Sequence, residues 1–422
     1  MELTRRDFLR AGTGAAAAAA GEAAAAPQPF FGLHPFIEAN PKAVFIRKTR
    51  VPHKMDAPAK LREGLALARE IFVPMSRPGI PVTRKVVVKP NITSVRGGLR
   101  RPAEDNWGTG TDPQFYEGLI TGLRELGVRN FHSVEANMYW AWNYRGFMDI
   151  NQRLGVKMNE PERYPRNFRN GEGITWSKVP EGVIYTRIPH YAPVNEPDTW
   201  VLNVAKWKAH GMCLTQTVKN EQGMVVGPFV RFCQGWQMVT GAPEVMKPEI
   251  NPRAEELLKA AFERHRKMGY SRYESRAELG PMTQEIWAQK TCDNMSVLTR
   301  TGLAMVEGIY GRDGDGFGTG NDHLTNLVFF GKDSFRVDLV GLYLGGHEPG
   351  NVHLYRIARE RGLCDTFNPW EVPVYEWSQG RAVPRKLSDF ERTPLKTYYL
   401  RRDGEPEYHL VNEPFDYDRV RL

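Results

Sequence analysis

Cysteine is scarce in this sequence, and the few cysteines are not arranged as metal ligands. Only four occur in 422 residues, no two form a C-x-x-C pair, and no histidine pair at zinc-finger spacing accompanies them. This pattern excludes a zinc ribbon and an iron–sulfur cluster module. We expect buried thiols, or at most one or two disulfides, at Cys213, Cys233, Cys292 and Cys364.

Long apolar runs and blocks of one charge sign are also missing after residue 26. No later segment is long and apolar enough to cross a bilayer, so no membrane span is expected. Lys and Arg number 57 against 49 Asp and Glu, a net charge of +8 that is spread along the chain. A nucleic-acid binder would need a basic stripe and a recognisable binding module. The mild positive excess therefore favours a small anionic ligand and excludes a nucleic-acid partner.

The N-terminus is typical of an export signal. Thr4–Leu9 reads TRRDFL, which resembles the twin-arginine (Tat) motif, and an alanine-rich stretch follows it as far as Ala26. Small residues before Pro27 suit a signal peptidase. We expect residues 1–26 to be a signal peptide that the Tat translocase recognises, which predicts an exported, periplasmic protein.

Strand-like and helix-like stretches alternate in residues 27–364, which predicts one α/β domain with a mostly parallel sheet and helices on both faces. The expected strands are 43–47, 85–88, 130–134, 183–188, 200–204, 303–306 and 327–330. The expected helices are 57–72, 113–126, 251–268, 284–290, 334–344 and 352–361. With 41% hydrophobic residues, the chain can bury a sizeable core.

Residues 365–422 differ in composition from the preceding part of the chain: prolines recur, and residue pairs typical of β-turns occur. Gln379-Gly380 and Asp403-Gly404 each lie between strand-like stretches, which predicts hairpins over 374–383 and 397–411. We expect a β-rich C-terminal extension that packs on the α/β domain.

Polar side chains follow four of the predicted strands. Ligands of open parallel sheets bind beyond the carboxyl ends of the strands, and the four loops would share that edge if the strands are neighbours. Lys89 and Asn91 follow the strand 85–88, and Glu135 follows 130–134. Lys206, Lys208 and His210 follow 200–204, and Glu307, Asp313 and Asp315 follow 303–306.

The segment NVAKWKAH carries cations at alternate positions, so an extended chain would point Lys206, Lys208 and His210 the same way. One interpretation is an anion clamp with a titratable imidazole. The alternative is a solvated edge strand, which lysines also favour. Lys219 and Asn220, followed by Gly223, could complete an anion site or cap a turn.

The glycine-rich run Gly311–Gly320 matches no established motif. Its glycines alternate, so it is not a dinucleotide fingerprint, and Phe317 and Leu324 occupy ligand positions of a calcium loop. A loop over the site, with Asp313 or Asp315 facing a ligand or a divalent metal, is the remaining interpretation. Walker A, G-x-S-x-G and H-E-x-x-H motifs are absent from the sequence.

Several stretches together resemble the family known as domain of unknown function 362. They are VVVKPN at 86–91, TDP at 111–113, NVAKWKAH at 203–210, Lys219-Asn220 with Gly223, EGIYG at 307–311 and KDSFRVD at 332–338. The resemblance implies an α/β fold with a shared site, but no reaction. The chain departs from many members at Glu307, where they have aspartate, and at Cys292-Asp293, where they have His-Asp.

The sequence supports two main functional hypotheses and a weaker third one. The first is an exported enzyme acting on a small anionic substrate, with His210, Lys208, Lys206 and Glu307 as catalytic residues and Lys89, Asn91, Lys219 and Asn220 as substrate ligands. In it, Asp313, Asp315 and Glu135 are candidate ligands of a divalent metal. The second is a non-catalytic periplasmic protein that carries a cofactor or metal. A weaker third hypothesis is a protein-binding module formed by the aromatic stretch 138–144.

Overall fold

The structure is a computed structural model, and it describes residues 30–76, 78–93, 108–136, 139–159, 173–230, 247–275, 280–299 and 301–420. The expected signal peptide, Cys233 and the start of the aromatic stretch lie outside the described residues. None of the described helices is long and apolar enough to span a membrane.

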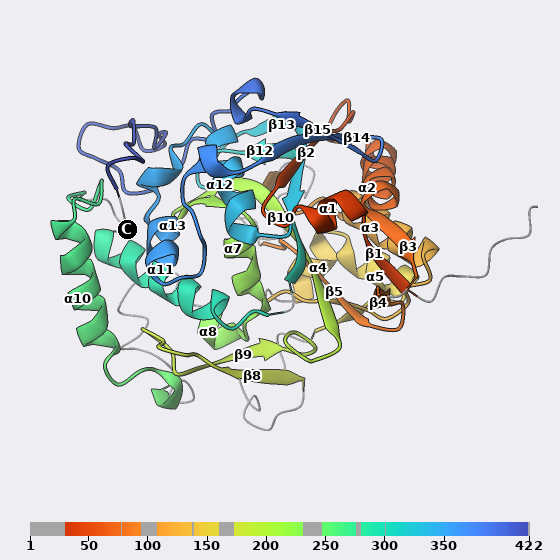
Figure 1. Cartoon of the computed structure of the whole chain (residues 1–422), viewed down its shortest axis with the longest axis horizontal. Coiled ribbons are helices and arrows are strands. Elements are labelled where there is room, and N and C mark those ends of the chain that lie inside the picture. Colours follow the sequence, from red (N-terminus) through yellow and green to blue (C-terminus); the bar gives the residue numbers. More distant parts are fainter. Residues whose placement is uncertain are drawn as a thin grey trace, which may run out of the picture.

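A ten-stranded sheet forms the centre of the molecule (Figure 1). Its strand order is β15-β14-β2-β13-β12-β10-β5-β6-β7, with β11 attached to β10. The bounds are β2 (Val44–Lys48), β5 (Lys85–Pro90), β6 (Phe131–Ser133), β7 (Lys157–Met158), β10 (Thr199–His210), β11 (Cys213–Thr215), β12 (Thr301–Arg312), β13 (Asp322–Gly331), β14 (Val374–Ser378) and β15 (Arg381–Arg385). The run β12-β10-β5-β6-β7 is parallel throughout, whereas β13 is antiparallel to both of its neighbours. The expected mostly parallel sheet is confirmed.

Helices cover both faces of the sheet. Successive strand residues point to opposite sides, and apolar residues on both sides need a covering layer. In β12, Leu303 and Met305 enter one core and Ala304 and Val306 the other. Figure 1 shows α2 and α3 on the first side and α7, α11, α12 and α13 on the second. Their bounds are α2 (Ala57–Ile71), α3 (Pro113–Glu125), α7 (Thr217–Glu221), α11 (Pro281–Met295), α12 (Ser334–Leu344) and α13 (His353–Glu360).

The remaining elements are peripheral. Strands β1 (Phe30–Leu33), β3 (Phe72–Met75) and β4 (Ile80–Pro81) form one small sheet, and β8 (Ile174–Lys178) and β9 (Arg187–Tyr191) form another. The other helices are α1 (Pro35–Ala39), α4 (Tyr139–Tyr144), α5 (Phe147–Leu154), α8 (Gly227–Val230) and α10 (Ala254–Lys267).

The predicted strand over 183–188 is wrong for most of its length, and a buried carboxylate explains why. Asp293, fully buried on α11, accepts hydrogen bonds from the backbone N–H groups of Val183, Ile184 and Tyr185 at 2.7–3.0 Å. Those amides are therefore not available to a neighbouring strand, and β9 begins only at Arg187. Asp293 thus holds the backbone of this segment in place.

The C-terminal extension joins the body in two ways. The first predicted hairpin is confirmed as β14–β15, and it continues the central sheet because β14 pairs in parallel with β2. The second predicted hairpin reduces to a single bridge between Thr397 and His409.

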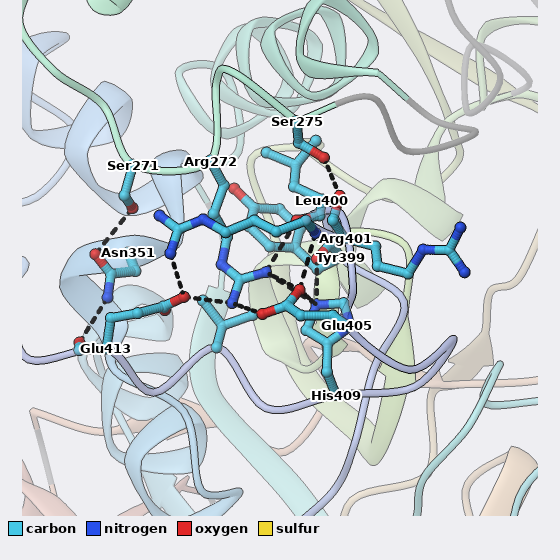
Figure 2. A network of polar contacts seen from close by, with 12 residues as sticks. Ser271, Arg272, Ser275, Asn351, Tyr399, Leu400, Arg401, Glu405, His409 and Glu413 are labelled. Atoms are coloured by element: carbon cyan, nitrogen blue, oxygen red, sulfur yellow. Dashed lines mark hydrogen bonds and ion pairs between the residues drawn. The ribbon is translucent and has the colours of Figure 1, made fainter.

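Figure 2 shows the reason for the missing second hairpin: backbone carbonyls that would form a ladder are used by side chains. The carbonyl oxygen of Leu400 accepts from Arg272, and that of Tyr399 accepts from His409 Nε2 at 2.8 Å. Arg272 is fully buried and also pairs with Glu405 and Glu413. Arg272, in the α10–α11 connection, therefore holds the C-terminal segment by a carbonyl oxygen and by two carboxylates.

Candidate functional site

The candidate site lies at the carboxyl ends of β5, β6, β10 and β12, as the sequence predicts. These four strands are adjacent and parallel, in the order β12-β10-β5-β6. Strands β10 and β12 run further than expected, so Lys206, Lys208, His210 and Glu307 are strand residues rather than loop residues. Because β10 lies inside the sheet and every residue of it is buried, the edge-strand interpretation is wrong.

Lys89 is the centre of a fully buried polar network. Its Nζ lies 2.8 Å from Glu135 Oε2 and donates to the backbone oxygen of Pro90 at 2.6 Å. It also donates to Asn220 Oδ1 at 3.2 Å, and Asn91 Nδ2 donates to the same oxygen at 3.1 Å. Burial lowers the pKa of Lys89, and the Glu135 carboxylate opposes that effect. The structure therefore brings Lys89, Asn91, Glu135 and Asn220 together, with the lysine paired to the carboxylate.

Gly223 allows this network to form. It lies in a short 3-10 helix, Gln222–Met224, that continues α7. A Cβ atom at this position would lie 2.6 Å from Glu135 Oε1 and 2.7 Å from Lys89 Nζ, closer than real Cβ contacts come. The glycine is thus needed for the close approach of α7 to β5 and β6.

A second buried pair joins β10 to β12. Lys206 Nζ lies 2.7 Å from Glu307 Oε2, and both side chains are at most 1% exposed. The same carboxylate accepts from the backbone N–H of Asp112 at 3.0 Å and from that of Ile309 at 2.8 Å. Asp112 in turn caps α3 and pairs with the buried Lys60 at 2.7 Å. Lys206 and Glu307 therefore connect the sheet to α3.

Lys208 differs from the other two lysines, although it too is fully buried. Its Nζ donates to the backbone oxygen of Thr109 at 2.7 Å and to Thr93 Oγ1 at 3.2 Å, and it lies 4.1 Å from the centroid of the Phe317 ring. Among the residues described, no carboxylate forms an ion pair with it. Burial lowers the pKa of Lys208 well below its ordinary value, and Lys219, Arg145 and Arg312 lower it further.

His210 lies at the end of β10 and is 8% exposed. Its ring contacts Trp287, Phe317 and Tyr398. Burial lowers the pKa of His210 well below its ordinary value, and the nearby lysines Lys219, Lys208 and Lys290 add to the effect. The backbone N–H of Met212 donates to His210 Nδ1 at 3.2 Å, so the neutral ring carries its proton on Nε2. His210 is therefore a neutral hydrogen-bond donor.

The glycine-rich loop brings an aromatic ring to the site rather than a carboxylate. Asp313 accepts from the backbone N–H of Asn321 at 2.6 Å and contacts His323 at 3.1 Å, and Asp315 accepts from the N–H groups of Phe317 and Thr319. Both aspartates thus hold the loop's own shape, and the loop places Phe317 against Lys208 and His210.

The three candidate metal ligands are not gathered into one group. Glu135 binds Lys89, whereas Asp313 and Asp315 bind loop groups. Across the described part of the chain, no three His, Cys, Asp or Glu side chains are placed to hold a metal ion. The three described cysteines, Cys213, Cys292 and Cys364, are buried and unbridged.

Sequence reasoning missed Arg145 and Phe317 as site residues. Arg145 is 7% exposed, and it donates to Thr109 Oγ1 and to the carbonyl oxygen of Thr93. It directly follows the aromatic stretch 138–144 that the sequence interpreted as a protein contact, and nothing in its spacing links it to β10. The sequence analysis used Phe317 only as evidence against a calcium-binding loop, because a phenylalanine at a ligand position cannot bind calcium.

The comparisons with known proteins identify the family and nothing more specific. No curated protein and no solved structure matches the chain. The model of the family described as "Domain of unknown function (DUF362)" matches residues 86–343, more than half of the chain and all four strands of the site. The protein therefore belongs to the DUF362 family.

Proposed function

We propose that the protein binds a small anionic substrate at the strand-end cluster and acts on it with Lys208 and His210. The observation that carries the proposal is the unbalanced charge around Lys208. Lys89 and Lys206 each have a carboxylate at 2.7–2.8 Å, whereas Lys208 has only neutral partners among the described residues. A buried cation needs a counter-charge, and an anionic ligand would supply it.

The other side chains take supporting roles in this proposal. Lys219 and Arg145 add positive potential around Lys208, which attracts an anion and stabilises charge that develops on it. His210 donates through Nε2–H to the bound substrate, as an electrophile or general acid. The ion pairs Lys89–Glu135 and Lys206–Glu307 fix the positions of the strand ends, so their lysines are positioning residues rather than substrate ligands.

Export is part of the proposal and is supported by the sequence. The TRRDFL segment and the alanine-rich stretch after it are typical of twin-arginine signals. Replacing both Arg5 and Arg6 with lysine should leave the protein in the cytoplasmic fraction of a bacterial host with a Tat system. Equal periplasmic amounts of variant and parent would contradict this part.

A panel of small organic anions tests the binding proposal. Ligands that raise the unfolding temperature of the full protein are then assayed for turnover by NMR. Stabilisation should disappear in Lys208→Met and persist in Lys85→Met, because Lys85 lies at the opposite end of the sheet and pairs with Glu196. His210→Ala should slow turnover. A ligand that binds at Lys208 but is never converted would favour a non-catalytic binding protein instead.

A further inference from the structure

Three buried lysines stand at neighbouring strand ends, and they differ in what their amines contact. The amines of Lys89 and Lys206 are held by Glu135 and Glu307. Each of these two amines therefore has a carboxylate as a close partner. Among the described residues, Lys208 donates to a backbone carbonyl and to a threonine hydroxyl, and its third close partner is the Phe317 ring.

The surroundings of Lys208 are those of an activated amine. A lysine that is desolvated and lies beside other cations loses its proton easily and becomes a nucleophile. Lys208 is fully buried, and Arg145 donates to Thr109, the residue whose backbone oxygen accepts from Lys208. Burial and the neighbouring cations both lower the pKa of Lys208. Both effects favour the uncharged form of the Lys208 amine, which is the form that can attack a carbonyl carbon.

We propose that Lys208 forms an imine with an anionic aldehyde or 2-oxo acid. The inference rests on the proposed function and names its substrate class. Lys208 Nζ bonds to the carbonyl carbon, the carbon–oxygen double bond breaks, and the oxygen leaves as water with the two amine protons. The cations around Lys208 hold the carboxylate of the substrate. His210, which contacts the same Phe317 ring, provides an N–H donor for the carbonyl oxygen.

Reductive trapping with glyoxylate tests the inference. Glyoxylate is a small anionic aldehyde, and cyanoborohydride reduces its imine to a carboxymethyl-lysine that peptide mapping locates. The full protein should be labelled on Lys208 about tenfold or more faster than on Lys89 or Lys206, since carboxylates hold the amines of those two lysines. Lys208→Arg should abolish that label, and its unfolding curve reports whether it folds. Labelling confined to exposed lysines in a folded parent protein would overturn the inference.

Oxalate separates this inference from the proposed function, because it is a dianion without an electrophilic carbonyl carbon of the aldehyde kind. If oxalate stabilises the parent protein but glyoxylate leaves Lys208 unlabelled, the covalent step is wrong and the anion site stands. If Lys208 is labelled, the inference stands whether or not oxalate binds. If neither occurs, both proposals fail.

Discussion

Lys206 and Glu307 occupy directly paired positions of the neighbouring strands β10 and β12, and their charged atoms lie 2.7 Å apart with almost no exposure to solvent. Neither charge would be tolerated alone at this depth, because removing one partner leaves the other buried and unpaired. The pair therefore fixes the spacing of the strand ends from which Lys208 and His210 project.

Glu307→Gln should lower the free energy of unfolding by about 3–5 kcal/mol, the usual cost of orphaning a buried charge. Urea denaturation at neutral pH measures it. Lys85→Met is the matched control, because Lys85 pairs with Glu196 in a half-exposed position and should cost less than about 1 kcal/mol. A Glu307→Gln protein as stable as the control would show that the pair has no structural role.

Gly223→Ala should weaken the Lys89–Glu135 network by forcing α7 away from β5. Its Cβ would lie 2.7 Å from Lys89 Nζ, and overpacking of this kind costs about 1–3 kcal/mol. Gly227→Ala is the control, since the nearest atom to its Cβ, Tyr191 Oη, is 3.9 Å away. Thermal unfolding of the two variants should differ clearly. Equal unfolding temperatures would mean that the network adjusts without cost.

Glu221 should make the protein less stable as the pH rises from about 4.5 to about 7. Burial raises the pKa of Glu221 from 4.5 to about 7, against hydrogen bonds from Asn203, Ser334 and Thr301. Over that interval the folded state holds a proton that the unfolded state has released, so rising pH favours unfolding. The full effect is on the order of 3 kcal/mol.

Glu221→Gln removes that titration, because it replaces the carboxyl group with an amide of nearly the same shape. Urea denaturation at several pH values should therefore give a flatter stability profile for the variant than for the parent protein. Asp338, whose pKa burial also raises to about 7, remains in both proteins, and its charge is one of the causes that raise the pKa of Glu221. Parallel pH profiles for the two proteins would refute the assignment of the titration to Glu221.

Arg272→Lys should loosen the C-terminal segment. Arg272 binds both oxygens of Glu405, at 2.8 and 2.9 Å, and a lysine cannot reproduce that fork. We expect a loss of about 1–3 kcal/mol and faster proteolysis between Thr397 and Val411. Arg401→Lys provides the comparison, because the side chain of that arginine is exposed. Identical proteolysis of the two variants would argue against the anchor.

The mostly parallel sheet was predictable, because hydrophobic runs identify buried strands and parallel strands share one edge. From the sequence alone, that reasoning predicts that Lys89, Glu135, Lys208 and Glu307 lie at one edge if their strands are neighbours. Which lysine lacks a carboxylate was not predictable, since Glu135 and Glu307 come from different strands and their reach depends on register. Arg145 was missed for the same reason: it approaches Lys208 only through tertiary packing.

In the C-terminal region, turn pairs alone did not suffice to predict the hairpins. The turn pair at Gln379-Gly380 predicted a real hairpin, while the pair at Asp403-Gly404 did not. Local turn chemistry was similar in both segments. The outcome was decided by Arg272, a buried residue distant in sequence that takes the carbonyl oxygen of Leu400.

The central claim is that Lys208 is the cation of an anion site, and calorimetric titration with oxalate tests it most directly. Oxalate should bind the parent protein and Lys85→Met alike, and Lys208→Met should bind about tenfold or more weakly, a loss of about 1.4 kcal/mol or more. Equal affinity of the parent protein and Lys208→Met, or no binding to either, would contradict the account.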